Sequence, residues 1–200
     1  MISHKHKLIF LHVPKNAGCS IERTIGCEEE LKYTYKYKNN EKPYLINKQH
    51  AIPIEIKEEY GKNIWNEYIK IAVVRNPWDR FVSLYFHFKR IKLLSEKITF
   101  EKFVNIFDAN KQNILQQKHI NMGLPQTTWT TKEIDIILSF ENLAEEFSLI
   151  ATDLGFNKNL KWINKTDHSE YTSYYDENTK QIIRNIYYDD IEKFSYRFRR

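Results

Sequence analysis

Short apolar segments alternate along the chain with segments whose apolar residues recur at helical spacing. The apolar segments cover residues 8–13, 69–74 and 134–139, a length typical of buried strands. Helices are predicted over residues 18–26, from Pro53 to Tyr60, from Pro77 to Leu94, in a short segment after Thr99, from Glu141 to Leu154, and from Asp176 to Phe194. Residues 28–48 are polar and predict a long loop. This alternation predicts an α/β fold with a mainly parallel central sheet flanked by helices.

The expected helix boundaries coincide with prolines and glycines. Pro53 and Pro77 suit the first turn of a helix, where a missing N–H costs nothing. Gly26, Gly61 and Gly155 stand where the helical spacing stops, as expected of residues that accept a left-handed backbone.

Composition narrows the class of protein. A chain of 200 residues with 42% hydrophobic residues fits a single domain over 1–200. The net charge of +5 suggests an anionic ligand and is too small to indicate nucleic acid. No apolar run is long enough to span a membrane, and the segment LIFLHV is too short for a signal peptide. With two cysteines and no CxxC, we expect a cytoplasmic protein.

The first candidate for chemistry is the segment LIFLHVPKNAGCSI, residues 8–21, which predicts a strand, a loop and a helix. Ala17 and Gly18 would let main-chain N–H groups approach an anion at the positive end of the helix. Lys15 adds a charge and Ser20 a hydroxyl. The spacing is not that of GxxxxGK[ST], and no GxGxxG is present. An ordinary strand-to-helix turn with a solvated Lys15 is the alternative.

The second candidate, VVRNPWDRFVSLY at residues 73–85, repeats this architecture. Arg75 follows a predicted strand at the edge where α/β sheets bind ligands, and it could hold a phosphate bidentately. Ser83 could complete the same site. Arg80 is the competing candidate for the phosphate, but for Arg80 and Asp79 we expect a local ion pair on the surface.

Together the two segments resemble the sulfotransferases that use 3′-phosphoadenylyl sulfate. HVPKNAGCSI is similar to their 5′-phosphosulfate loop, HxPKTAGTSx, and VVRNPWDRFVSLY to their 3′-phosphate motif, RNPxxRxxSxY. Pro125-Gln126, ILSFENLAEEF, INKTDHSEY and DDIEKFSYRF recur in that family in the same order. The pattern is that of the carbohydrate sulfotransferases, including the uronyl 2-O group, and their short microbial relatives.

The resemblance implies a sulfotransferase fold with a P-loop-like first turn, and transfer of a sulfuryl group to a hydroxyl, releasing adenosine 3′,5′-bisphosphate. By position it assigns donor binding to two main groups of residues and, more weakly, to a late NKT segment. They are Lys15, Asn16, Ala17, Gly18, Cys19 and Ser20 for the phosphosulfate, Arg75 and Ser83 for the 3′-phosphate, and Lys165 and Thr166 in that late segment. Asn16 and Cys19 replace the family's threonines, which predicts altered donor binding. We expect that no metal is required, because Lys15 and the helix end supply positive charge.

Sulfuryl transfer to a hydroxyl needs a proton acceptor, usually a histidine. Of seven histidines, His50 precedes a helix that starts at a proline, as the base does in the uronyl 2-O group, and we assign it this role by resemblance. His119 and Glu141 are the reserve candidates for the base. His12 lies in the first strand and is expected to be a core residue.

The acceptor implied by the resemblance is a saccharide or glycan. Residues 28–48 and 108–132 are expected to shape its pocket, where Tyr33, Tyr35, Tyr37, Tyr44 and Trp129 could stack on sugar rings. Three alternatives stay open: a small-molecule kinase of P-loop type, a nucleotide-binding protein that has lost catalysis, and nucleic-acid binding through the basic C-terminal tail. A solvated tail is the simpler interpretation of the last, so we expect no nucleic-acid partner.

Overall fold

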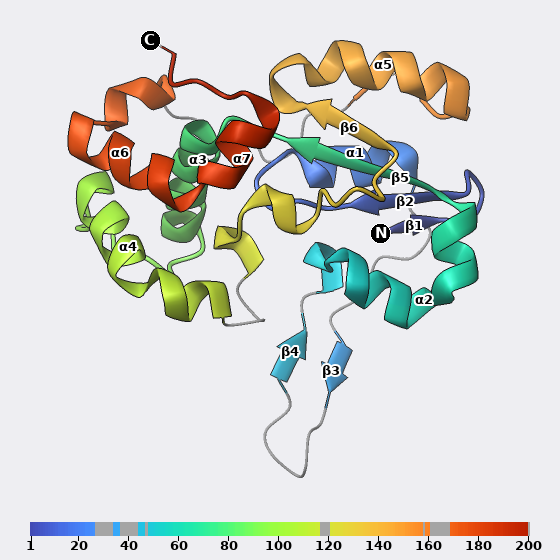
Figure 1. Ribbon diagram of the computed structural model, residues 1–200, viewed down its shortest axis with the longest axis horizontal. Helices are drawn as coiled ribbons and strands as arrows, with labels where there is room; N and C mark the ends of the chain where they lie inside the picture. Colours follow the sequence, from blue (N-terminus) through green and yellow to red (C-terminus); the bar gives the residue numbers. More distant parts are fainter. Residues whose placement is uncertain are drawn as a thin grey trace. The chain divides into compact units, whose positions relative to one another are not determined.

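The computed structural model of the protein describes residues 1–26, 34–36, 44–46, 48–116, 121–157, 159–160 and 169–199 (Figure 1). The fold divides into two compact units. Met1–Val74 and Thr128–Ile163 form the first, and Arg75–Thr127 and Asn164–Arg200 form the second. Each unit is therefore assembled from two separate stretches of chain.

The first unit contains a four-stranded sheet in the order β1-β2-β5-β6. Its strands are β1 (Ile2–Ser3), β2 (Leu8–Leu11), β5 (Ile69–Val74) and β6 (Ile136–Ser139). β5 pairs in parallel with β2 and β6, with Leu11 opposite Ala72 and Val74 opposite Ser139, whereas β1 is antiparallel to β2. The predicted α/β class with a mainly parallel sheet is confirmed. Parallel strands place the loops after β2, β5 and β6 at one edge.

One face of this sheet is covered by α1 (Gly18–Ile25) and α5 (Leu143–Leu154), the latter visible beside β6 in Figure 1. Alternate strand residues point to this face, as the period of two requires. Leu8, Phe10, Ile71, Val73 and Leu138 form a buried cluster with Ile21 and Ile25 of α1 and Leu143, Phe147 and Ala151 of α5. The opposite face is also buried at Ile9, Leu11 and Ala72, as expected of a parallel sheet. The apolar character of the strands follows from this two-sided burial.

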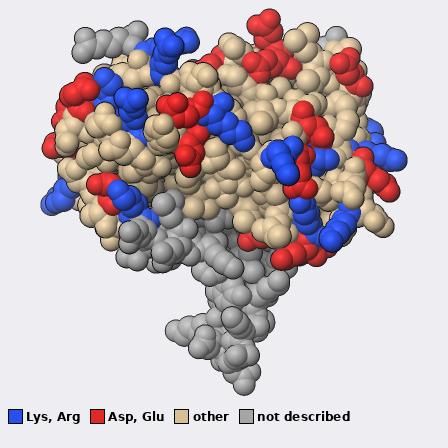
Figure 2. Space-filling model, in the orientation of Figure 1, with Lys and Arg blue, Asp and Glu red and all other residues tan. Residues whose placement is uncertain are grey.

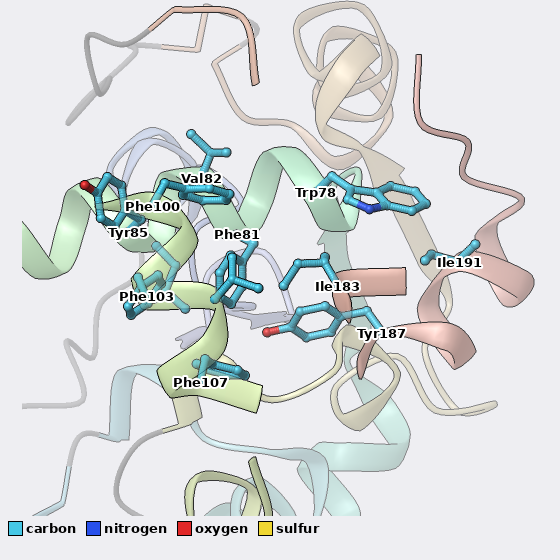
Figure 3. Close-up of a cluster of buried hydrophobic side chains, with 12 residues drawn as sticks. Trp78, Phe81, Val82, Tyr85, Phe100, Phe103, Phe107, Ile183, Tyr187 and Ile191 are labelled. Carbon is cyan, nitrogen blue, oxygen red and sulfur yellow. The ribbon is translucent and has the colours of Figure 1, made fainter. Parts of the chain in front are cut away.

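The second unit is helical. It contains α3 (Pro77–Arg90), α4 (Phe100–Gln116), α6 (Glu177–Ile186) and α7 (Tyr188–Phe194), with short 3₁₀ turns at Asn121–Gly123, Gln126–Thr128 (which runs one residue beyond the unit) and Tyr171–Tyr174. Apolar side chains of these helices form one cluster, shown in Figure 3. Its centre is Phe81, whose ring lies 5.1 Å from those of Phe103 and Phe107 between centroids.

Several predicted boundaries need correction. α2 (Pro53–Glu67) does not end at Gly61; the helix is interrupted there, at φ 83° and ψ 159°, and resumes. Asp176–Phe194 is two helices, because Tyr187 leaves helical geometry at φ −111° and ψ 31°. The predicted loop 28–48 contains β3 (Thr34–Lys36) and β4 (Tyr44–Ile46), which pair antiparallel, and it runs into the 3₁₀ turn Lys48–His50. The two strands pair through backbone hydrogen bonds, which leave no apolar pattern in the sequence. The sequence therefore did not predict them.

The outer surface carries charges of both signs. In Figure 2 the Lys and Arg side chains of the visible face are interspersed with Asp and Glu. No helix in the described part of the chain has the length and hydropathy needed to cross a membrane.

Candidate active site

The loop between β2 and α1 has a backbone suited to an anion. Lys15 and Ala17 both adopt the left-handed region, with φ of 70° and 60°. Left-handed residues in a turn direct neighbouring main-chain N–H groups to one side, as in anion-binding nests. Ala17 is the N-cap of α1 and has no side chain to accept from the first N–H groups of the helix. The loop therefore offers main-chain donors to a negatively charged ligand.

Burial alternates along this loop. Lys15, Ala17 and Cys19 are partly exposed, whereas Asn16, Gly18 and Ser20 are buried. Asn16 is 1% exposed, and its Nδ2 donates to the carbonyl of Val73 at 2.7 Å. The Asn16 side chain thus ties the loop to β5. Ser20 is fully buried in the first turn of α1.

Gly18 is required by a side chain rather than by its own dihedral angles. A Cβ at this position would overlap the imidazole of His12, which lies against the Gly18 main chain. His12 is 4% exposed, which confirms the prediction of a core histidine. The imidazole of His12 thus packs against the loop from its buried side.

His12 belongs to a polar network that the sequence did not reveal. Its Nδ1 lies 2.6 Å from Oε1 of Glu22 on α1, and Nε2 of Gln49 donates to the other carboxylate oxygen at 3.1 Å. Because an ionised carboxylate only accepts, Nδ1 of His12 carries a proton toward Glu22. The same Gln49 amide lies 3.8 Å from Sγ of Cys19. Glu22 and Gln49 gave no signal because both are common on polar helix faces and loops.

His50 is held at two points beside His12. Its Nδ1 lies 3.0 Å from the carbonyl oxygen of His12, and the two rings meet edge to face with 4.5 Å between centroids. Nε1 of Trp129 donates to the His50 carbonyl at 3.1 Å. A carbonyl can only accept, so Nδ1 of His50 is protonated and the neutral ring carries its lone pair on Nε2.

Trp129 corrects an expectation about the acceptor pocket. It is fully buried and hydrogen-bonded to His50, so it is not exposed for stacking on a sugar. The side chains of Tyr33, Tyr35, Tyr37 and Tyr44 lie outside the described residues. The same holds for His119, Lys165 and Thr166. The reserve base Glu141 is exposed and accepts a hydrogen bond from Ser139 Oγ.

In the second unit, Arg75 follows directly after β5 and is buried, at 7% exposure. Its Nε donates to Oδ2 of Asp79 at 2.8 Å, four residues along the chain. Ser83 is buried on α3, the helix that Pro77 begins.

The structure overturns the expected pairing of Asp79 with Arg80. Asp79 binds Arg75, and Arg80 is buried, with one Nη donating to the carbonyls of Met122 and Leu124 at 3.1 and 2.9 Å. Burial lowers the pKa of Arg80 from its ordinary value, while the nearby Tyr187 and Asp190 oppose that shift. Residues 79 and 80 point in different directions from α3, and only Asp79 is one helical turn from Arg75.

Two buried side chains complete the surroundings of Arg75. Gln126 pairs with both main-chain groups of Arg75, and Asp190 accepts from the main chain of Gln126. Gln126 stood in the recurring Pro125-Gln126 pair and Asp190 in DDIEKF, but neither motif by itself indicated a partner. In the part of the chain that the structure describes, no three His, Cys, Asp or Glu side chains gather as a metal site would require.

Comparison with known proteins identifies the family. A model of the sulfotransferase family matches residues 1–197, nearly the whole chain. The chain therefore belongs to the sulfotransferase family, as the motifs predict. An uncharacterized protein of Archaeoglobus fulgidus is 27% identical over 112 residues, which are 52% of this chain and 82% of that protein.

A solved structure is also similar. The crystal structure of a sulfotransferase from Alicyclobacillus acidocaldarius is 13% identical, with a TM-score of 0.42. The match covers 71% of this chain and 57% of that structure, so this chain spans little more than half the length of that protein.

Proposed function

We propose that this protein transfers a sulfuryl group from 3′-phosphoadenylyl sulfate to a hydroxyl of a carbohydrate acceptor by in-line displacement. Family membership supports sulfuryl transfer in general. The observation that carries the donor assignment is the loop from Pro14 to Ser20, with its two left-handed residues and uncapped helix start. The carbohydrate acceptor rests on the sequence resemblance.

The loop residues fit the phosphosulfate end of such a donor. Lys15 and the main-chain N–H groups from Asn16 to Cys19 would hold the anionic oxygens and stabilise the charge that develops on the leaving group. Cys19, as a weak donor, contributes mainly through its N–H. Asn16, Gly18 and Ser20 shape the loop from the buried side. When bound, the donor supplies the sulfuryl group.

At the other end of the donor, Arg75 would hold the 3′-phosphate together with Ser83 of α3. Lys165 and Thr166 would close over the nucleotide. Arg75 suits this role because its guanidinium is oriented by Asp79 and carries four N–H donors besides Nε–H. The same pairing moderates the positive charge of an arginine that is otherwise buried.

His50 is proposed as the base that takes the acceptor's hydroxyl proton. The contact of Nδ1 with the His12 carbonyl supports this role, because it leaves the lone pair of the neutral imidazole on Nε2. Trp129 fixes the main chain of the same residue. A base held in one tautomer loses no free energy in selecting it at each turnover.

The test is transfer of labelled sulfuryl from the donor to a panel of saccharides. Lys15→Ala should lower kcat by about 10²–10³-fold, the usual loss when one stabilising donor is removed. His50→Ala should lower it by about 10²–10⁴-fold. Lys5→Ala and His4→Ala, at exposed positions near the N-terminus, serve as matched controls and should retain activity.

The outcomes separate the alternatives. Near-normal transfer by the His50→Ala protein would refute the base assignment alone. Thermal stabilisation by adenosine 3′,5′-bisphosphate without transfer to any acceptor would indicate a nucleotide-binding protein that has lost catalysis. Phosphoryl transfer that depends on ATP and Mg²⁺ would indicate the kinase.

A further inference from the structure

The main chain of Arg75 is hydrogen-bonded to the side chain of Gln126, 51 positions away. Arg75 N–H donates to Oε1 of Gln126 at 2.8 Å, and Nε2 of Gln126 donates to the Arg75 carbonyl at 2.9 Å. The amide thus pairs with Arg75 as a neighbouring strand would, one residue beyond the end of β5. Gln126 is fully buried, so water does not compete for these two bonds.

Gln126 is in turn held by α7. Oδ2 of Asp190 accepts from the Gln126 N–H at 2.8 Å, and Oδ1 accepts from the Thr127 N–H at 2.9 Å. Asp190 is itself fully buried. A carboxylate that accepts two adjacent main-chain N–H groups fixes the direction of that peptide, and so the direction in which the Gln126 side chain leaves it.

The same stretch of chain is clamped from two further sides. Arg80 binds the carbonyls of Met122 and Leu124, and the hydroxyl of Tyr187 donates to the carbonyl of Gly123 at 2.9 Å. Residues 122–127 therefore connect α3 and α7 to Arg75 through hydrogen bonds. In an exposed turn, water would satisfy the main-chain polar groups. Here protein side chains satisfy several of them instead, as buried polar groups require.

We propose that Gln126 is a positioning residue for recognition of the donor's 3′-phosphate, acting through the Arg75 main chain, with Asp190 holding it in place. This inference rests on the proposed function, which assigns the 3′-phosphate to Arg75. Main-chain bonds on both sides of the Arg75 Cα fix the direction of its Cα–Cβ bond, and Asp79 fixes the far end of the side chain. A bidentate contact with a phosphate depends on this direction.

The experiment measures binding rather than turnover, by titration calorimetry with adenosine 3′,5′-bisphosphate and with adenosine 5′-phosphate. The ratio of the two affinities isolates the contribution of the 3′-phosphate. Arg75→Ala should lower this ratio about 10–100-fold, the value of a charged contact. Gln126→Met, which keeps the side-chain volume and removes both bonds, should lower it about 3–10-fold while affinity for the monophosphate stays within twofold.

Two further variants sharpen the result. Combining Gln126→Met with Arg75→Ala should add no further loss to the ratio, because the first change acts only through the second residue. Thr127→Ala alters a partly exposed neighbour whose main chain alone binds Asp190, and it should leave the ratio unchanged. If the Gln126→Met protein does not fold, Asp190→Asn gives the same comparison, with a loss of at least about twofold expected.

Failure of the inference and failure of the proposed function give different results. A wild-type protein that does not prefer the bisphosphate would overturn both. A preference that Arg75→Ala abolishes and that Gln126→Met or Asp190→Asn leaves intact would overturn the positioning role alone. An equal loss of affinity for both nucleotides in Gln126→Met would also overturn it, because that pattern shows a general structural role.

Discussion

At Gly18, the imidazole of His12 occupies the place where a side chain would otherwise lie. The sequence indicated a small residue at this position for the sake of an anion. The structure adds a second reason, since the loop must also rest on the His12–Glu22 pair. The absence of a Cβ at Gly18 therefore leaves room for a ligand on one side of the loop and for the His12 ring on the other.

This close approach predicts a compensating pair of substitutions. Gly18→Ala should destabilise the protein by about 1–3 kcal/mol, the usual cost of overpacking, because its methyl group meets the His12 ring. In the double variant His12→Ala, Gly18→Ala, the ring is gone, and the loss should be smaller than the sum of the two single losses. Urea denaturation of the four proteins measures this difference. Strict additivity would show that the loop moves away from His12 at no cost.

At the residue scale, the sequence predicted the burial of one side chain correctly and the ion-pair partner of another wrongly. His12 was expected in the core and is buried. The partner of Asp79 was wrong, because a pairing of neighbours in sequence ignored the direction in which each leaves the helix. The assignments of Lys15, His50, Arg75 and the other donor residues stay predictions.

Two helices of the second unit begin at a proline or a capping side chain that the sequence shows. α3 begins at Pro77, with Asn76 Oδ1 accepting from Trp78 N at 3.1 Å. α6 follows Asp176, whose Oδ1 accepts from the main-chain N and hydroxyl of Thr179 at 2.7 and 2.6 Å. Such starts are local and can be read from sequence. The interruption at Gly61 and the break at Tyr187 could not be predicted from the sequence, because each residue is compatible with a helix that ends and with one that continues.

The cap of α6 predicts a pH dependence of stability. Hydrogen bonds from Thr179 lower the pKa of Asp176 below its ordinary value. A folded-state pKa below the unfolded one means that the stabilisation is present above about pH 3.9 and is lost as the pH falls through the folded value. At pH 7 the wild-type Tm should exceed that of Asp176→Asn, and the gap should close in acid.

The control for this experiment is Asp153→Asn, an exposed change in the last turn of α5. It should show no such closing gap. A difference between wild type and Asp176→Asn that is constant from pH 7 to pH 3 would show that the charge of Asp176 does not stabilise the helix.

At the scale of the whole molecule, the chain leaves its first unit after Val74, returns at Thr128 and leaves again near Asn164. The aromatic cluster of the second unit therefore joins α3 and α4 to α6 and α7, from residues about a hundred positions apart (Figure 3). Periodicity showed that each helix has an apolar face, but it does not show which faces meet. The prediction that residues 1–200 form one domain stays a prediction.

Phe81 should be the most sensitive position of this cluster. It is 1% exposed and contacts aromatic rings of α4 and α6–α7, including Phe103 and Tyr187. Phe81→Ala should lower the free energy of unfolding by about 3–5 kcal/mol, whereas Leu93→Ala, at a side chain 70% exposed, should change it by less than about 0.5 kcal/mol. Chemical denaturation measures both free energies. If Phe81→Ala lost as little as Leu93→Ala, this cluster would not be the main stabilising core.

The sequence by itself determined the three parallel strands, most helix starts and the family. Each depends on residues within a few positions of one another, where spacing sets geometry. Only the tertiary structure decided that His12 supports Gly18, that Trp129 holds His50, and that Gln126 and Asp190 hold Arg75. Those partners are brought together by folding, and a buried polar group takes whichever partner the packing places within reach.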